Sequence, residues 1–277
     1  MIAAIKNHIE EAKCLLEHQA DPNIYDEDHR TALLFAAYHG HTLLSQLLLD
    51  HEAHIDHKNK VGKTALIRAA QRGHEETVLV LLANNTDVNI RDMVGRTALM
   101  TAAFSGYPTV CEILLDTGAD LHIRAKDGRT CLMFAAESER EKERKKERER
   151  EEEDRGVEER EEGKEKSVTE LLLEKGAEVD IQAKNGWTAL MWAAYKGNSF
   201  SLSLLLSAGA TVNLQEEVGC TALMLAATNG YMDCVVILLE NNSNIHLRDR
   251  QGLTALEWAM KKSHLAVVKE IKRWGEV

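Results

Sequence analysis

Hydrophobic and polar positions along the chain follow one pattern that returns every 33 residues. Each copy starts at a threonine, continues through a short apolar segment with an alanine pair, passes a glycine and reaches a pair of leucines. The threonines are Thr31, Thr64, Thr97, Thr130, Thr188, Thr221 and Thr254. A fixed period of this size indicates a repeat architecture in which each copy is one structural unit.

The pattern predicts two helices in each repeat. A threonine before Ala-Leu is typical of a helix N-cap, because its hydroxyl accepts a hydrogen bond from a free backbone N–H. The glycine nine residues after each of five threonines predicts the end of the first helix, since glycine adopts the left-handed conformation without steric cost. These glycines are Gly40, Gly73, Gly106, Gly197 and Gly230. The second helix carries the leucine pair, and a single repeat buries too little apolar surface to be stable alone.

The recurring motif resembles the ankyrin repeat over essentially the whole chain. Gly62-Lys63-Thr64-Ala65-Leu66 with its alanine pair, glycine and leucine pair carries the resemblance, and the following repeat preserves it. The resemblance implies an all-α fold, a helical repeat solenoid in which short β-turn fingers precede pairs of antiparallel helices. It also implies a concave groove that binds proteins.

The period divides residues 1–277 into a single ankyrin-repeat domain. We expect a partial repeat at 1–25 and seven repeats at 26–58, 59–91, 92–124, 125–182, 183–215, 216–248 and 249–277, the last of which is the C-terminal cap. The chain begins inside the first helix of the partial repeat, which is consistent with a fragment or with a short cap. Lys272 replaces a leucine in the last repeat, as a polar outer cap requires.

The chain departs from the family pattern at the slot that usually holds histidine, three residues after the threonine. Apolar residues fill six of the seven positions, and Glu257 fills the last. Four of them are methionines: Met100, Met133, Met191 and Met224. A methionine column at this spacing predicts core packing against the adjoining repeat, and not a ligand site.

One charged insert interrupts the period between Thr130 and Thr188. Of the 30 residues from Glu137 to Lys166, 15 are acidic and 11 basic, so no cationic field accumulates and nucleic acid is not expected as a partner. An exposed docking helix is one interpretation. A tolerated surface expansion, partly helical or disordered, is the other, and we favour it because such a segment buries no core.

Composition favours a soluble intracellular protein. The five cysteines are odd in number and lack paired metal spacing, which is typical of a reducing compartment. No leader and no apolar run of about 18 residues is present, so membrane insertion is not expected. We therefore expect a cytoplasmic monomer, with the nucleus as a further possible compartment.

The sequence offers little for catalysis, so we expect no enzyme activity, no cofactor and no metal. It has no Gly-rich phosphate loop and no nucleophile elbow. The densest candidate is a histidine cluster within 19 residues, formed by His39, His41, His51, His54 and His57. The repeat pattern places these side chains at opposite ends of a helix about 15 Å long, so a single metal site is not expected.

Binding residues are expected at the positions that the repeat leaves variable. These are the finger residues four, three and one before each threonine and the helix residues seven and eight after it. Aromatic residues and arginine anchor many interfaces. The expected central contacts are Met93, Val94, Arg96, Phe104, Arg129, Trp187 and Tyr195, and Arg30, Lys63 and Tyr38 extend them.

The residue before the threonine changes from basic to apolar along the chain, as Arg30, Lys63, Arg96, Arg129, Trp187, Cys220 and Leu253. This order predicts a protein partner with an acidic-hydrophobic segment, bound by a scaffold or adaptor. The alternative is a substrate-recognition or regulatory fragment of a larger enzyme, such as a ubiquitin ligase or kinase.

The resemblance suggests one modification site. Some ankyrin repeats are hydroxylated by an intracellular asparaginyl hydroxylase at the asparagine that ends an Asp-Val-Asn run, and Asp87-Val88-Asn89 fits this pattern. Asn23 and Asn213 are weaker matches. The alternative interpretation is an asparagine that only forms hydrogen bonds within the finger.

Overall fold

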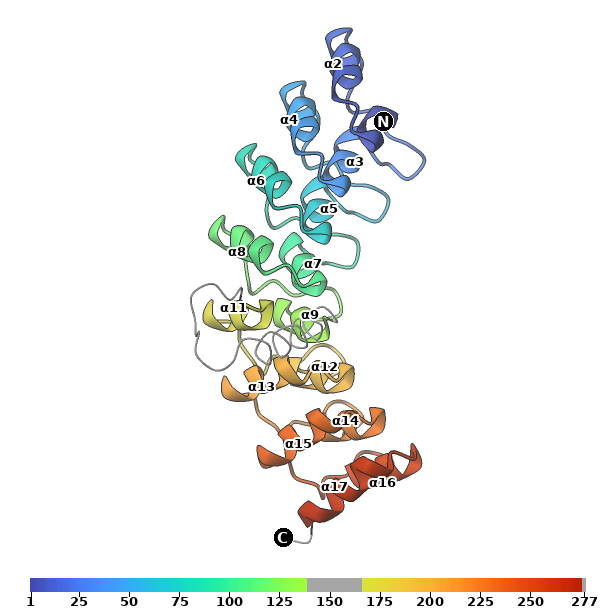
Figure 1. Ribbon diagram of the computed structural model, residues 1–277, viewed down its shortest axis with the longest axis vertical. Coiled ribbons are helices and arrows are strands. Elements are labelled where there is room, and N and C mark those ends of the chain that lie inside the picture. Colours follow the sequence, from blue (N-terminus) through green and yellow to red (C-terminus); the bar gives the residue numbers. More distant parts are fainter. Residues whose placement is uncertain (139–165, 276–277) are drawn as a thin grey trace, which may run out of the picture. The chain divides into compact units, whose positions relative to one another are not determined.

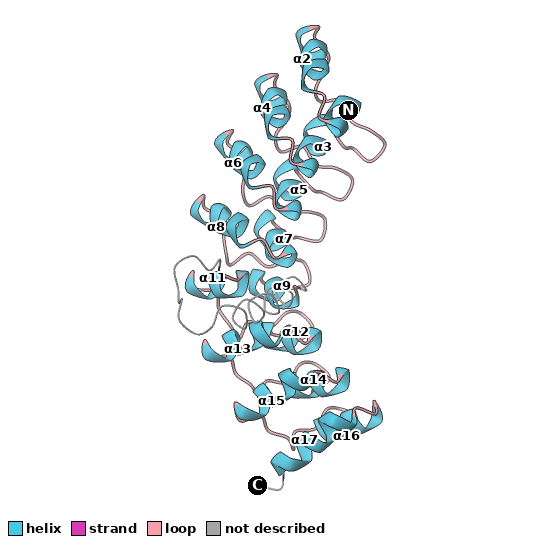
Figure 2. Cartoon of the chain, viewed as in Figure 1, coloured by secondary structure: helices cyan, strands magenta, loops and turns pink. Residues whose placement is uncertain are grey.

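The computed structural model describes residues 1–138 and 166–275. These residues form 16 helices, and their only β-pairing is an isolated bridge between Tyr25 and Thr31. Figure 2 shows the helices joined by loops and turns. The expectation of an all-α helical repeat fold is therefore confirmed. The charged segment 139–165, and with it the question of a docking helix, lies outside the described residues.

Contacts divide the chain into two compact units, Met1–Lys126 (unit 1) and Asp127–Val277 (unit 2). Unit 1 contains helix pairs that follow one another in sequence, as Figure 1 shows. The pairs are α1 (Ile2–Lys6) with α2 (Ile9–Glu17), α3 (Ala32–His39) with α4 (Thr42–Asp50), α5 (Ala65–Arg72) with α6 (Glu75–Ala83), and α7 (Ala98–Ser105) with α8 (Pro108–Asp116). Within unit 1 the first helices of neighbouring pairs contact each other, as α3 contacts α5 and α5 contacts α7.

Unit 2 has the same pairing, and the charged segment falls within its first pair, between α9 and α11. Its pairs are α9 (Cys131–Glu137) with α11 (Val168–Glu174), α12 (Ala189–Lys196) with α13 (Ser199–Ser207), α14 (Ala222–Asn229) with α15 (Met232–Glu240), and α16 (Ala255–Lys261) with α17 (Leu265–Gly275). Helix α11 has 7 residues, whereas α13 and α15 have 9. The capping box of Ser167 and Glu170 starts this shorter helix directly after the charged segment.

The threonines cap the first helices, as expected. In each full repeat the hydroxyl accepts a hydrogen bond from the backbone N–H three residues later, as in Thr64 with Ile67 at 3.4 Å. The methionine column lies in the core, with Met100 only 1% exposed. Glu257 differs, because its carboxylate returns to the Thr254 backbone and completes a capping box.

The glycines that end the first helices serve a second purpose. Gly73 has a φ of 74°, and a Cβ placed there would lie 2.3 Å from the Tyr107 ring of the next repeat. The same contact joins Gly40 to His74, whose Nε2 donates to the Tyr38 carbonyl at 3.0 Å. Glycine is therefore required both for the left-handed turn and for the approach of the next repeat.

A short ladder connects adjacent fingers. In unit 1 the Met93 N–H donates to the Val61 carbonyl at 3.1 Å, and the Lys126 N–H donates to the Val94 carbonyl at 3.0 Å. Within a finger, Asp92 Oδ1 accepts the N–H groups of Val94 and Arg96. These bonds fix the backbone of the fingers.

None of the helices in the described part of the chain combines the length and the apolar character that a membrane crossing requires.

Candidate functional site

Three side-chain columns lie together on the surface made by the fingers and the first helices. The first column contains the residue before each threonine, the middle column the residue four positions after it, and the third column the residue seven positions after it. We call these three columns the surface columns. Lys63 Nζ donates to Gln71 Oε1 at 2.8 Å, which joins the outer two columns. The Arg30 guanidinium lies 5.0 Å from the centre of the Phe35 ring, which joins the first two columns.

The middle column was missing from the expected contact set. It consists of Phe35, Arg68, Thr101, Phe134, Trp192, Leu225 and Trp258, of which Thr101 and Phe134 are buried and the others partly exposed. Its neighbours in the helix are buried alanines and leucines that hardly vary between repeats. The variation of this one position in an otherwise uniform helix was the signal that could have identified it.

Large apolar side chains are exposed at the fingers and first helices of unit 1. Met93 is 60% exposed and Val94 51% exposed at a finger tip, and Phe104 on α7 is 46% exposed. Val61, at the tip of the preceding finger, is 52% exposed and was not among the expected contacts. Single exposed apolar residues are common on protein surfaces, but this group occupies positions that core packing leaves free.

Most of the basic column is paired with carboxylates, which the sequence did not predict. Arg30 pairs with Asp26 at 2.8 Å and with Asp28 at 3.2 Å. Arg96 pairs with Asp92 at 3.1 Å. The expected positive charge is therefore largely compensated at these two positions, because an aspartate four residues earlier holds each guanidinium against its own finger.

Arg129 in unit 2 is compensated in the same way. It lies 2.6 Å from an Asp127 oxygen and 2.8 Å from a Glu137 oxygen, and its guanidinium is 4.2 Å from the centre of the Phe134 ring. Asp26 also accepts hydrogen bonds from backbone N–H groups. Burial acts to raise its pKa, but these N–H groups and the Arg30 side chain donate to the carboxylate and hold the pKa below its usual value.

Lys63 is the exception in the basic column of unit 1. Its ammonium group bonds the neutral amide oxygen of Gln71, and Arg68 Nη1 lies 3.4 Å from the same oxygen. Burial lowers the pKa of Lys63, and the nearby positive charges of Arg68 and Arg96 lower it further. Burial also lowers the pKa of the Arg68 guanidinium.

A cavity of 230 Å³ lies beside Arg68 in unit 1. Leu34, Phe35 and Tyr38 supply its apolar wall, and Arg30, His39 and Arg68 supply its polar lining. The guanidinium carbons of Arg68 and Arg72 both lie 5.1 Å from the centre of the Tyr38 ring. Tyr38, an expected contact, is therefore the centre of a cationic and aromatic cluster.

The expected contacts of unit 2 form an aromatic cluster. The Trp187 ring lies 4.6 Å from Trp192 and 5.3 Å from Tyr195, measured between ring centres. Trp187 is half-buried in this cluster, whereas Tyr195 is 40% exposed. The ammonium group of Lys196 lies 5.9 Å from the centre of the Tyr195 ring and 3.5 Å from a Glu137 oxygen.

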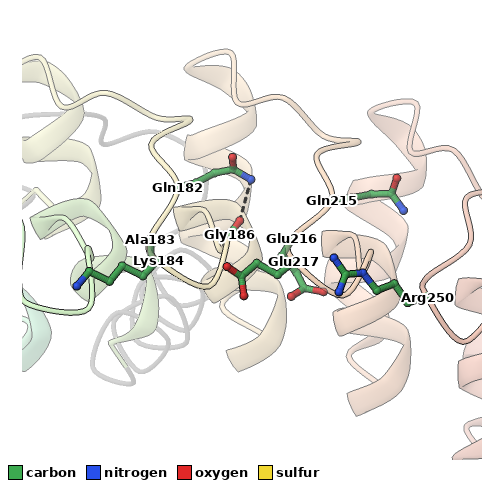
Figure 3. A pocket seen from close by; sticks show the side chains of 8 residues that line it. All are labelled: Gln182, Ala183, Lys184, Gly186, Gln215, Glu216, Glu217 and Arg250. Atoms are coloured by element: carbon green, nitrogen blue, oxygen red, sulfur yellow. Dashed lines mark hydrogen bonds between the residues drawn. The ribbon is translucent and has the colours of Figure 1, made fainter.

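A larger cavity, of 420 Å³, lies between the fingers of unit 2 (Figure 3). Its lining is polar and carries both signs of charge, with Lys184 and Arg250 opposed by Glu216 and Glu217. Glu216 Oε1 already accepts the N–H groups of Val218 and Cys220, so it supports the finger. This cavity has no converging set of free groups comparable to the Tyr38 cluster.

The expected histidines lie where the pattern placed them. His39 ends α3 and His41 precedes α4, whereas His51 follows α4 at its other end. In residues 1–138 and 166–275 no group of three or more His, Cys, Asp or Glu side chains is arranged to hold a metal ion.

Asn89, the expected hydroxylation site, bridges two repeats. Its Nδ2 donates to the Gly118 carbonyl at 3.3 Å, and its Oδ1 accepts the Asp120 N–H at 2.8 Å. Asn23 and Asn213 form the corresponding pairs of bonds with the repeats that follow them. Hydroxylation of Asn89 remains a prediction, and a modifying enzyme would have to separate these bonds to reach the side chain.

A family model described as ankyrin repeats (3 copies) matches the chain at residues 1–92, 86–143, 160–249 and 201–275. A comparison with curated proteins gives no significant match.

Proposed function

Because this chain belongs to the ankyrin-repeat family, whose repeats are generally protein–protein interaction modules, we propose that it is a non-catalytic scaffold or adaptor. It binds a partner protein on the surface columns and the finger tips. Members of the family are typically non-catalytic, and the chain has no motif that argues otherwise. The fold alone names no pathway, since the same array serves many functions.

The observation that carries this proposal is the exposure of large apolar side chains at Met93, Val94 and Phe104 in unit 1. Neither capping nor core packing requires apolar groups at these positions. Burial of such groups against a partner is favourable by about 25 cal/mol per Å² of apolar surface. Tyr195 in unit 2 adds an exposed aromatic residue of the kind that anchors interfaces.

The partner segment that fits this surface is acidic and hydrophobic. The apolar finger tips favour an aliphatic or aromatic side chain, and the Tyr38 cluster favours negative charge. Because Arg30, Arg96 and Arg129 are already paired, Lys63 and Arg68 carry more of the expected charge recognition than the other basic residues.

We also propose that the chain acts as a monomer in the cytoplasm. Its five cysteines are all free thiols, which favours a reducing compartment. Light scattering on a size-exclusion column tests the oligomeric state, and microscopy of the tagged chain tests the compartment.

Affinity capture from cell lysate, read by mass spectrometry, tests the binding surface. The test variant combines Met93→Ala, Phe104→Ala and Tyr195→Ala, whose side chains are 40% or more exposed, and circular dichroism checks that its fold is intact. Trp187 is not included, because it packs on Trp192 and its removal would disturb the cluster. We expect the test variant to lose specific partners that the wild-type chain retains.

The matched control combines Leu43→Ala, Leu79→Ala and Leu265→Ala, three exposed leucines on second helices. Both variants should give the circular dichroism spectrum of the wild type. Equal loss of partners from the two variants, or no loss from either, would place the binding surface elsewhere.

A further inference from the structure

Two cationic groups in unit 1 converge on one neutral oxygen. Lys63 Nζ lies 2.8 Å and Arg68 Nη1 lies 3.4 Å from Gln71 Oε1. Hydrogen bonds from cations are markedly stronger when the acceptor is a carboxylate than when it is an amide. The position where the two donors meet is therefore suited to an anion but holds an uncharged acceptor.

No carboxylate of the described residues forms an ion pair with Lys63 or Arg68. Asp92, whose charge acts on Lys63, is paired with Arg96. The two cations are half-buried, and burial lowers the pKa of both. A half-buried charge without a counter-ion is unfavourable, so an anion supplied from outside would be stabilised here.

In unit 2, two of the same slots hold a basic residue and a carboxylate. Arg129 occupies the same slot as Lys63, and Glu137 occupies the same slot as Gln71. The Glu137 carboxylate lies 2.8 Å from Arg129 and 3.5 Å from Lys196. The arrangement in unit 1 thus lacks the carboxylate that its counterpart in unit 2 contains.

Space for a partner side chain is present next to this position. Arg68 lines the cavity of 230 Å³, whose walls include Phe35 and Tyr38. Arg72, whose guanidinium also lies against the Tyr38 ring, adds a further positive charge next to that ring. A side chain in the cavity and an acidic neighbour at Lys63 and Arg68 would both be accommodated.

We propose that Lys63 and Arg68 bind the carboxylate of an aspartate or glutamate in the partner protein, with an apolar neighbour of that residue in the cavity beside Phe35 and Tyr38. This inference rests on the proposed function, since it assigns one contact of the proposed binding surface. Gln71 positions the two cations while the site is empty.

Selection from a random peptide library displayed on phage tests the proposal even though the partner protein is unidentified. The full-length wild-type chain is the target, and a Gln71→Glu variant is selected in parallel. Glutamate at this position supplies the missing carboxylate from within, as Glu137 does. We expect the wild type to enrich peptides with one dominant Asp or Glu position, and Gln71→Glu to show no such preference.

The strongest selected peptide is then synthesised in three forms, with its acidic residue, with the corresponding amide and with phosphoserine. We expect the amide form to bind the wild type about tenfold more weakly or worse, because a charge-assisted contact is lost. The acidic form and the amide form should both bind weakly to the Gln71→Glu variant, with no difference in affinity between them. Thr228→Glu adds the same charge at the position that corresponds to Gln71 in a repeat where Cys220 replaces Lys63. This control variant should bind the peptide as the wild type does.

Thermal unfolding separates a local from a global effect, since Gln71→Glu should be at least as stable as the wild type. If that variant is unstable, Lys63→Gln provides a second test, with the same expected loss of acidic preference. Enriched peptides without an acidic position, or strong binding of the phosphoserine form only, would overturn the carboxylate contact. If these peptides still lose affinity for the Phe104→Ala variant, the proposed binding surface stands even though the carboxylate contact does not. A library that yields no binder contradicts both the binding surface and the carboxylate contact.

Discussion

Gly73 shows how much one residue carries in this fold. Its left-handed backbone ends α5, and its missing side chain admits the ring of Tyr107 from the next repeat. Gly118 also has a positive φ, of 94°, but a Cβ placed there would meet nothing within 4 Å. The two glycines therefore separate the cost of the backbone conformation from the cost of the contact.

We expect Gly118→Ala to lower the free energy of unfolding by about 1–2 kcal/mol, the cost of a left-handed alanine. Gly73→Ala should lose this amount and about 1–3 kcal/mol more, because the Tyr107 ring must move. Urea unfolding followed by circular dichroism measures both. Equal losses would show that the ring contact places no demand on Gly73.

The single residues that the sequence predicted correctly are those whose role is local. The threonine caps and the buried methionines follow from spacing within one helix. The pairing of Arg96 with Asp92 was missed, because a long flexible side chain has several possible partners and the finger geometry selects among them. The same reason explains why the middle surface column, which contains Arg68 and Trp192, was not recognised.

Helix α16, like α11, begins with a capping box. Thr254 and Glu257 form a capping box in which Glu257 Oε2 accepts the Thr254 N–H at 2.7 Å, and Arg248 lies 3.1 Å from the same oxygen. The hydrogen bond from the Thr254 backbone N–H and, to a smaller extent, the one from the Thr254 hydroxyl lower the pKa of Glu257 from its usual value of 4.5. The carboxylate form is therefore favoured in the folded state.

A lowered pKa gives this cap a defined pH dependence. Its contribution to stability is present above the unfolded-state pKa of Glu257, near 4.5, and disappears as the pH falls through the lower folded-state value. We expect Glu257→Gln to lower the melting temperature at neutral pH, with the difference shrinking to zero in acid. Differential scanning calorimetry across this range measures it. Glu112→Gln, on the exposed face of α8, serves as the control, and an identical acid profile for both variants would contradict the assignment.

Helix α11 illustrates the limit of prediction at this scale. The sequence placed the interruption between the two helices of the repeat, and α9 and α11 lie on its two sides. It did not predict that α11 would be two residues shorter than α13, because the leucine pair defines the end of the pattern better than its beginning. Ser167 and Glu170, a capping pair, mark the start that the structure shows.

On the scale of the whole molecule, the array could be predicted because the same sequence pattern recurs in every repeat. Helices contact their own partner and the adjacent repeat within each unit, as the contacts of α5 with α3, α6 and α7 show. What one repeat cannot state is which surface positions a partner uses. The expected contacts divide between the two units, and the Tyr38 cluster arises from α3 and α5 together.

If the charged insert is a tolerated expansion, the chain should fold without it. We expect a variant in which Gly-Asn, copied from Gly197-Asn198, replaces residues 139–165 to be as stable as the wild type, because the replacement restores the 33-residue period. Circular dichroism and urea unfolding measure this. A chain with the reversed order Asn-Gly in place of Gly-Asn controls for the turn, and loss of the folded state in the Gly-Asn variant would show that the insert has a structural role.

The contact between a terminal glycine and the ring of the next repeat has a consequence for protein engineering. The pairs Gly40 with His74, Gly73 with Tyr107, Gly197 with Tyr231 and Gly230 with His264 all join a glycine to a planar ring. Histidine and tyrosine both occur as the ring in this contact, so repeats taken from different places in the chain should be interchangeable. A graft that keeps both halves of the contact should assemble even when its finger tips differ.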